Sequence, residues 1–230
     1  MSEVASKARG LVVFDLDGTL VDDMHLIGQS AARVIHEAFG TPLEVAAAQY
    51  YSTTGKPFEL QLRELYPEAT PFELSRTVSK FHETKVKDAY RQASLFREVP
   101  EVLRRLDRSG WSLVVATGAE KEMAELILER EGIAFLIQKV LGAGQGTKDV
   151  HLREYSALLP GLPHVMVGDS RFDMEVARQF PDYLILGRAS HLADWTLTPN
   201  DLKRWGARWA DYTLERLPEV LDELAPPASG

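Results

Sequence analysis

Short, fully apolar runs recur along the chain. The first covers residues 11–14 and ends at Asp15; later runs cover 113–116, 165–167 and 184–186, with a weaker one at 140–141. Strands that are buried on both faces have this pattern. Apolar residues recur at helical spacing between the later runs, over 99–106, 123–131, 150–158 and 174–177. This alternation predicts an α/β fold, a Rossmann-like parallel sheet core with helices on both faces.

The region 22–95 breaks the alternation. It has helical patterns over 27–38, 60–65 and 72–90, and no convincing strand. Because the first predicted strand precedes it, we interpret it as an all-helical subdomain inserted into the α/β domain. The core domain would then comprise residues 10–21 and 96–225, and the ends, 1–9 and 226–230, are expected to be flexible tails.

Composition narrows the class of protein. The chain has 45% hydrophobic and 26% charged residues, as in ordinary globular proteins. It has no cysteine, which excludes disulfides, thiolate metal sites and a cysteine nucleophile. A net charge of −8 argues against nucleic acid as the main partner. No run approaches the ~18 apolar residues of a membrane span, and the first ten residues lack a signal-peptide core, so we expect no membrane partner and a cytoplasmic location.

The sharpest motif is Asp15-Leu16-Asp17-Gly18-Thr19-Leu20, directly after the first predicted strand. In open parallel sheets, ligands bind at the carboxyl ends of strands. Gly18 permits a tight turn, so Asp15 and Asp17 can approach one point. A surface turn with two solvated acids is the simpler alternative. A calcium loop is another, but Thr19 and Leu20 do not fit its pattern. We therefore predict a catalytic site here.

Two further segments carry candidate chemistry. Thr117 and Gly118 follow a strand and offer a hydroxyl and an unblocked backbone N–H to a phosphate oxygen. Asp169 follows another strand and can complete a magnesium site with Asp15 and Asp17. Asp173, one helical turn further on, could orient a lysine or a metal-bound water. It could also be an acid favoured by the helix dipole.

Other motifs fit less well. The glycine-rich segment 142–146 does not follow the first strand, as a dinucleotide fingerprint should, and Gly146-Thr147-Lys148-Asp149 lacks the order of a nucleotide-binding phosphate loop. No histidines are paired at metal-ligand spacing. We interpret Trp195, Trp205 and Trp209 as packing residues.

With these motifs, the chain resembles the haloacid dehalogenase-like superfamily of phosphohydrolases, over about residues 10–224. It is most similar to the phosphoglycolate phosphatase-like branch, which has a helical cap between its first and second motifs. The resemblance implies that Asp15 attacks phosphorus to give an aspartyl-phosphate, with Asp17 as general acid and base. It also implies that Mg²⁺ is held by Asp15, Asp17, Asp169 and Asp173, the main contribution of Asp17 being its backbone carbonyl.

In such enzymes Lys148 and Thr117 would hold the phosphoryl group. The chain departs from many relatives at Gly118, where they have Asn, and at Asp149, where they have Pro. A lone lysine at a helix start is usually solvated, so Lys121 and Lys139 remain alternatives to Lys148. Asp17 favours phosphoryl transfer over carbon–halogen hydrolysis, because the dehalogenases of the superfamily lack this second acid.

The cap is expected to select the substrate, a small phosphate monoester resembling phosphoglycolate or a sugar phosphate. Thr54, Gly55 and Lys56 would lie over the active site. Lys56 could meet a carboxylate or a second phosphate of the substrate, or it could be a solvated turn lysine, and His25 at the hinge is a weaker candidate. The alternatives are a phosphomutase of the β-phosphoglucomutase type, a phosphonate hydrolase with a Schiff-base lysine, and a catalytically silent binding module. The oligomeric state is expected to be monomer or homodimer.

Overall fold

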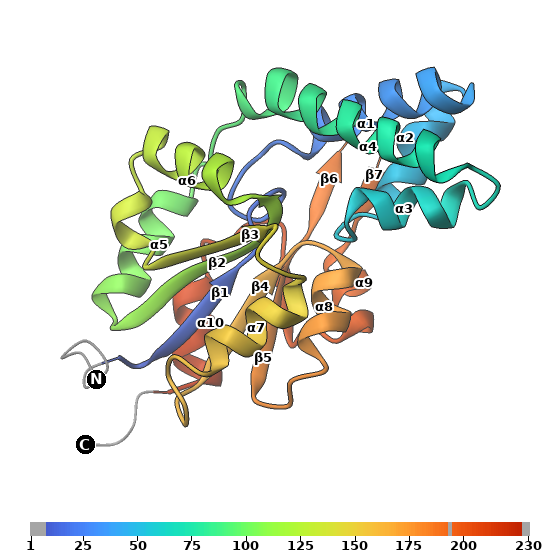
Figure 1. The fold of residues 1–230 in the computed structure, drawn as a ribbon. Helices are drawn as coiled ribbons and strands as arrows, with labels where there is room; N and C mark the ends of the chain where they lie inside the picture. Colours follow the sequence, from blue (N-terminus) through green and yellow to red (C-terminus); the bar gives the residue numbers. More distant parts are fainter. Residues whose placement is uncertain (1–7, 193–194, 227–230) are drawn as a thin grey trace.

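The computed structural model describes residues 8–192 and 195–226, and its centre is a parallel sheet (Figure 1). The sheet has six strands in the order β3-β2-β1-β4-β5-β8, all parallel. The strands are β1 (Gly10–Phe14), β2 (Trp111–Glu120), β3 (Lys139–Ala143), β4 (His164–Gly168), β5 (Tyr183–Arg188) and β8 (Trp209–Asp211). The α/β prediction is confirmed, and all five predicted apolar runs lie in strands.

Helices cover both faces of the sheet because both faces are apolar. Val12 and Phe14 of β1 pack into one hydrophobic cluster, whereas Leu11 and Val13 pack into another. The first face is covered by α5 (Val99–Arg108), α6 (Lys121–Arg130) and α10 (Leu217–Leu224). The second face is covered by α7 (Lys148–Ser156), α8 (Arg171–Ala177) and α9 (Pro199–Trp205). The short 3₁₀ turn η3 (Ala134–Leu136) follows α6. A strand buried on both sides explains why each run is apolar without alternation.

Between β1 and β2 the described chain is helical from Met24 to Tyr90, and we call this segment the helical insertion. It comprises α1 (Met24–Phe39), α2 (Leu43–Ser52), α3 (Phe58–Leu65), α4 (Pro71–Thr84) and the π-helix η2 (Lys85–Tyr90). In Figure 1 it lies beyond the carboxyl ends of the strands, at the opposite end of the molecule from the start of β1. This position puts it over the edge of the sheet where Asp15 emerges.

Two details of the insertion were not predicted. Helix α2 was missed because its Ala-rich stretch has no clear apolar stripe. The single helix predicted over 72–90 is divided, since the chain changes to a π-helix at Lys85. A capping box between Thr70 and Glu73 begins α4, which agrees with its predicted start.

Past β5 the sequence patterns were too short to predict the structure. The antiparallel hairpin of β6 (Ser190–Leu192) and β7 (Trp195–Leu197), the edge strand β8 and the helices α9 and α10 were all missed. Each of these strands has only three residues, too few to show a period.

The two chain crossings between the sheet and the insertion lie side by side. Asp22 N–H donates to Ser94 O at 2.8 Å, Phe96 N–H donates to Leu20 O at 3.1 Å, and Val21 and Leu95 form an antiparallel bridge. This ladder fixes both crossings at one place, close to the predicted boundaries at 21/22 and 95/96.

Several expectations stay predictions. Residues 1–7 and 227–230 of the expected tails lie outside the described residues; the side chain of Arg9 binds Asp222 and two carbonyls near the end of α10. Among the helices that the structure describes, none has the length and apolar character to cross a membrane. The cytoplasmic location and the oligomeric state remain untested.

Candidate active site

The candidate residues from four separate segments meet at the carboxyl edge of the sheet. Asp15 follows β1, and its N–H donates to Val167 O of β4 at 2.9 Å. Asp169 follows β4, Thr117 lies near the end of β2, and Lys148 begins α7. All four side chains are buried or nearly so and line one cleft of about 420 Å³. The structure therefore brings these four predicted site residues together.

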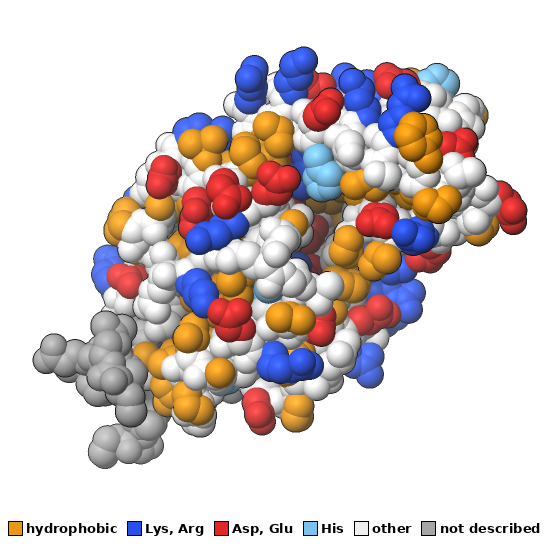
Figure 2. Space-filling model, viewed as in Figure 1, with side chains coloured by type: hydrophobic (Ala, Val, Ile, Leu, Met, Phe, Trp, Pro, Cys, Tyr) orange, Lys and Arg blue, Asp and Glu red, His pale blue; other side chains and the backbone are white. Residues whose placement is uncertain are grey.

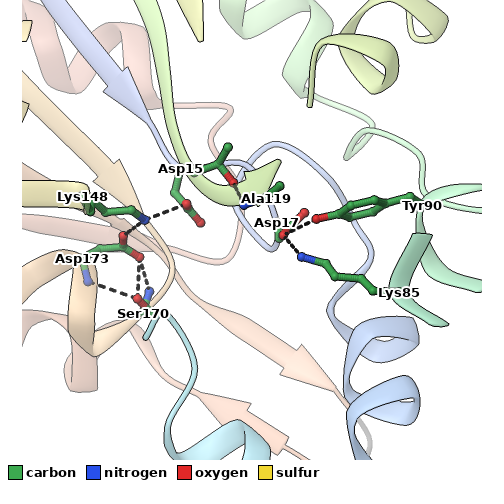
Figure 3. Close-up of polar contacts among 9 residues, drawn as sticks. Asp15, Asp17, Lys85, Tyr90, Ala119, Lys148, Ser170 and Asp173 are labelled. Carbon is green, nitrogen blue, oxygen red and sulfur yellow. Dashed lines mark hydrogen bonds and ion pairs between the residues drawn. The ribbon is translucent and has the colours of Figure 1, made fainter. Parts of the chain in front are cut away.

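Lys148 lies between two carboxylates (Figure 3). Its Nζ donates to Asp15 Oδ1 at 2.7 Å and also forms a short ion pair with Asp173. Burial opposes the positive charge, but Asp15 and Asp173 outweigh it and hold the pKa of Lys148 above its usual value. Lys148 is thus cationic and held against Asp15. The alternatives Lys121 and Lys139 instead form ion pairs with Glu125 and Glu154.

Asp173 combines the two roles that were considered for it. Its Oδ2 accepts hydrogen bonds from the N–H and the hydroxyl of Ser170, which completes a capping box at the start of α8. Its Oδ1 faces Lys148. Because the cap fixes the carboxylate, Asp173 holds the lysine in one position.

Three buried carboxylates form a cluster at this edge. Oxygens of Asp15, Asp169 and Asp173 lie within 4.8 Å of one another. Burial raises the pKa of Asp15 to about 7, although Lys148 partly counters this, and burial together with the neighbouring carboxylates raises the pKa of Asp169 well above its usual value. Gly18 lets the loop after β1 approach this cluster, since a Cβ there would lie 2.3 Å from Asp169 Oδ2. The single positive charge of Lys148 does not balance the negative charge that these three carboxylates would carry when ionised.

Asp17 points away from that cluster, toward the helical insertion (Figure 3). Its Oδ2 accepts hydrogen bonds from Lys85 Nζ at 2.6 Å and from Tyr90 Oη at 3.1 Å. The structure does not place its side chain among the clustered carboxylates, so the predicted metal role of Asp17 rests on its backbone carbonyl. Neither Lys85 nor Tyr90 was identified from the sequence.

The π-helix explains how both residues reach one oxygen. Lys85 and Tyr90 are five residues apart, and in an α-helix such positions point about 140° away from each other. A π-helix, with its i to i+5 hydrogen bonds, brings them onto one side. Lys85 Nζ also lies 4.5 Å from the centroid of the Tyr90 ring, a cation–π contact. Only the three-dimensional structure reveals this arrangement.

Asp23 is a second group that sequence reasoning missed. Its side chain is fully buried, and neither of its oxygens nor Asp17 Oδ1 has a hydrogen-bond partner among residues 8–192 and 195–226. Burial raises the pKa of Asp23 well above its usual value, and the negative charge of the nearby Asp17 adds to this. The available signal was the unusual pair Asp22-Asp23 directly after the first motif.

Thr117 and Gly118 both line the cleft at the irregular end of β2. The Thr117 hydroxyl accepts a hydrogen bond from Ala119 N–H at 3.0 Å, which leaves its own hydrogen available. Gly118 is exposed and lines the same cleft. A register irregularity in β2 between Ala116 and Glu120 opens the backbone at this point.

The segment 53–57 of the insertion reaches the core. Thr54, Gly55 and Lys56 line the cleft, and a Cβ on Gly55 would lie 2.1 Å from Ser170 Oγ. Lys56 forms a 2.5 Å ion pair with Glu64. His25 lies elsewhere, in a separate cavity of about 620 Å³ beside the chain crossings. Figure 2 shows the cleft as a hollow between the two parts, with charged side chains inside and hydrophobic ones on its rim.

Comparisons with known proteins agree with this geometry. The family model described as haloacid dehalogenase-like hydrolase matches residues 12–180, from β1 to the end of α8. The chain belongs to this family. It is therefore an enzyme of the hydrolase class, as the motifs indicated.

Individual relatives cover nearly the whole chain. It is 28% identical to a phosphoglycolate phosphatase of Cupriavidus necator, over 94% of this chain and 96% of that protein. It is also 28% identical to a phosphoglycolate phosphatase of Neisseria meningitidis serogroup A, over 94% and 93%. A crystal structure of a predicted phosphatase from Clostridium acetobutylicum superposes with a TM-score of 0.79 at 22% identity, covering 94% of this chain and all of that one. The similarity to the Clostridium acetobutylicum structure shows a shared fold.

Proposed function

We propose that the protein is a magnesium-dependent phosphatase that hydrolyses small phosphate monoesters through an aspartyl-phosphate on Asp15. The observation that carries the proposal is the contact of Lys148 with both Asp15 and Asp173. In this contact a cation lies against Asp15 at the carboxyl edge of a parallel sheet, and ligands bind at such edges. The names of the relatives support the same class of reaction.

The buried carboxylate cluster fits a divalent cation. Burial, together with the neighbouring carboxylate of Asp173, raises the pKa of Asp15 and of Asp169, and hard carboxylate oxygens are what Mg²⁺ prefers. Asp15 and Asp169 would hold the ion, with the backbone carbonyl of Asp17, while Asp173 lies at the edge of the set and also holds Lys148. Bound there, Mg²⁺ would lower the repulsion between Asp15 and an anionic substrate.

The residues divide the reaction into two steps. A carboxylate oxygen of Asp15 forms a bond to phosphorus, the bond from phosphorus to the leaving oxygen breaks, and Asp17 gives that oxygen a proton. Asp17 then removes a proton from a water molecule. The water oxygen attacks phosphorus, and the acyl-phosphate bond breaks to regenerate Asp15. Lys148, Thr117 and the Gly118 N–H offset the charge on the phosphoryl oxygens throughout.

We further propose that residues 22–95 act as a cap that closes over a core of residues 10–21 and 96–225. Segment 53–57 already touches Ser170, and Lys85 already touches Asp17. A site covered in this way excludes water from the first step.

The test is a screen for Mg²⁺-dependent phosphate release over a broad panel of phosphate monoesters. We expect the wild-type protein to hydrolyse some of these esters, and we expect Asp15→Asn and Asp17→Asn each to abolish hydrolysis. Circular dichroism should show that both variants remain folded. Borohydride reduction of the phosphorylated enzyme should convert residue 15 to homoserine. Label that stays on a sugar phosphate without release of free phosphate would show a mutase, and no turnover of any ester would favour a binding module.

A further inference from the structure

We infer that the preferred substrate is the phosphate monoester of an uncharged alcohol with an apolar body, and not an ester such as phosphoglycolate with a second anionic group. This inference deepens the proposed function and rests on it for the position of the phosphoryl group. It comes from the charges and the apolar surface of the cleft that the insertion covers.

The cationic groups of the cleft are already committed. Among the described residues lining it, each lysine is in an ion pair: Lys148 with Asp15 and Asp173, Lys85 with Asp17, and Lys56 with Glu64. His82 also lines the cleft, but burial and the charge of Lys85 lower its pKa, so it is neutral at pH 7. A substrate carboxylate would therefore have to compete with an acidic side chain of the protein for each of these lysines.

The net charge of the residues that line the cleft also disfavours a second anionic group on the substrate. Five acids and three lysines line the cleft; the acids are Asp15, Asp17, Glu59, Asp149 and Asp169. One divalent cation would bring this set to neutrality, and the phosphoryl group would then add its own negative charge. A second anion on the leaving group would therefore enter a site without compensating charge, which is unfavourable in a partly buried cleft.

The wall that the insertion contributes is largely apolar. The rings of Phe58 and Phe81 lie 4.0 Å apart, and Tyr50 packs at about 6 Å from both, at 6.2 and 6.1 Å. Val78 and Leu60 extend this surface, and the core contributes further hydrophobic residues, Phe172 and Val176. Pockets of this kind bind ligands mainly through apolar contact, with a few polar groups to orient them. Here the phosphate site supplies the polar groups.

The test compares matched esters that differ in charge alone. Phosphoglycolate and its amide have nearly the same size, as do 4-carboxybenzyl phosphate and 4-carbamoylbenzyl phosphate; in each pair the amide lacks the second negative charge. We expect kcat/KM at least about tenfold higher for the uncharged member of each pair, since removal of one unfavourable charge interaction of ~1.4 kcal/mol gives this factor. A preference for phosphoglycolate of the same size would overturn the inference and leave the proposed phosphatase function intact.

Binding measurements test the inferred ligand class independently of the proposed phosphatase function. Asp15→Asn retains the apolar wall, so its calorimetric affinities for benzyl phosphate and phosphoglycolate rank the ligands without turnover. Tighter binding of benzyl phosphate is expected. If this ranking held but no ester were hydrolysed, the proposed function would fail while the inferred ligand class would stand; the opposite ranking would refute the ligand class.

A charge placed on the apolar wall tests the cause. Val78→Lys adds an unpaired cation inside the cleft, on the half-buried face of α4. It should raise kcat/KM for phosphoglycolate by about tenfold and lower it for benzyl phosphate. Phe72→Lys adds the same charge on the same helix, where the side chain is 74% exposed and does not line the cleft, and should change neither value. Equal effects of the two variants would contradict the assignment.

Discussion

Lys85 of the helical insertion donates a hydrogen bond to Asp17 of the core across a distance of 2.6 Å. The two side chains come from segments 68 residues apart and are both mostly buried, with 11% and 15% of their side-chain surfaces exposed. The position of the insertion therefore sets the position of the proposed general acid and base.

Replacement of Lys85 by methionine tests this dependence. Without the ammonium group, Asp17 loses its stronger partner, so kcat should fall by about 10–100-fold while KM changes little. Steady-state kinetics over a range of pH would measure both values and any shift in the acid and base limbs. Lys87→Met, on the exposed side of the same π-helix, is the matched control and should behave as wild type. A Lys85→Met enzyme with unchanged kcat and an unchanged pH profile would contradict the role.

Gly55→Ala tests whether activity requires the contact between segment 53–57 and the core, apart from any loss of stability. A methyl group there would lie 2.1 Å from Ser170 Oγ, so segment 53–57 must move off the core. We expect kcat/KM to drop by about tenfold or more, since small misplacements near a reacting centre are costly.

Gly40→Ala is the control for the left-handed backbone. Gly40 and Gly55 have φ values of 70° and 86°, and both substitutions should cost about 1 kcal/mol of folding free energy. No atom of the described part of the chain lies within 4 Å of a Cβ on Gly40, so only Gly55→Ala should lose activity beyond this shared cost. Equal activities at matched stability would argue against closure at Ser170.

Asp23 should make stability fall as pH rises. Burial raises its pKa in the folded protein above the value of the unfolded chain, so the folded state binds the extra proton and is favoured at low pH. This stability is lost as pH rises above about 4 and through the folded pKa. Asp23→Asn cannot ionise, and its amide can donate to Asp17.

Urea unfolding in EDTA at pH 5 and pH 8.5 measures this effect. The variant should gain stability over wild type at the higher pH, by about 1–3 kcal/mol, and gain less at the lower pH. Asp22→Asn, at the exposed neighbouring position, should show no such dependence. A gain that does not grow with pH would rule out ionisation of Asp23 as its cause.

Asp169→Asn should affect metal binding and stability in opposite directions. It removes one of the clustered carboxylates, so the Mg²⁺ concentration for half-maximal activity should rise at least about tenfold. In EDTA the same variant should melt at a higher temperature than wild type, because burial and charge repulsion disfavour the ionised Asp169. Differential scanning calorimetry with and without Mg²⁺ would show both effects, and a lower melting temperature in EDTA would refute the second.

The sequence predicted those parts of the site that follow from strands. Asp15, Thr117 and Asp169 each come at the end of an apolar run, and parallel strands present such ends at one edge. Lys148 was identified only through the resemblance to the superfamily, since nothing in its local pattern distinguishes it from a surface lysine. Lys85 and Tyr90 could not be predicted, because their convergence depends on a π-helix that replaces an α-helix within a continuous amphipathic stretch. Asp23 escaped notice because its burial depends on how the insertion packs over the first motif.

The paired crossings at 20–22 and 94–96 have a consequence for how such a protein can evolve. Because Val21 and Leu95 bridge directly, a tight turn of a few residues could join them and leave every strand of the sheet in place. The intervening 73 residues, from Asp22 to Ser94, are then an exchangeable module that enters and leaves through a single gap. Recombination at this one point could give the same core a different specificity without redesigning the sheet or the helices that pack on its two faces.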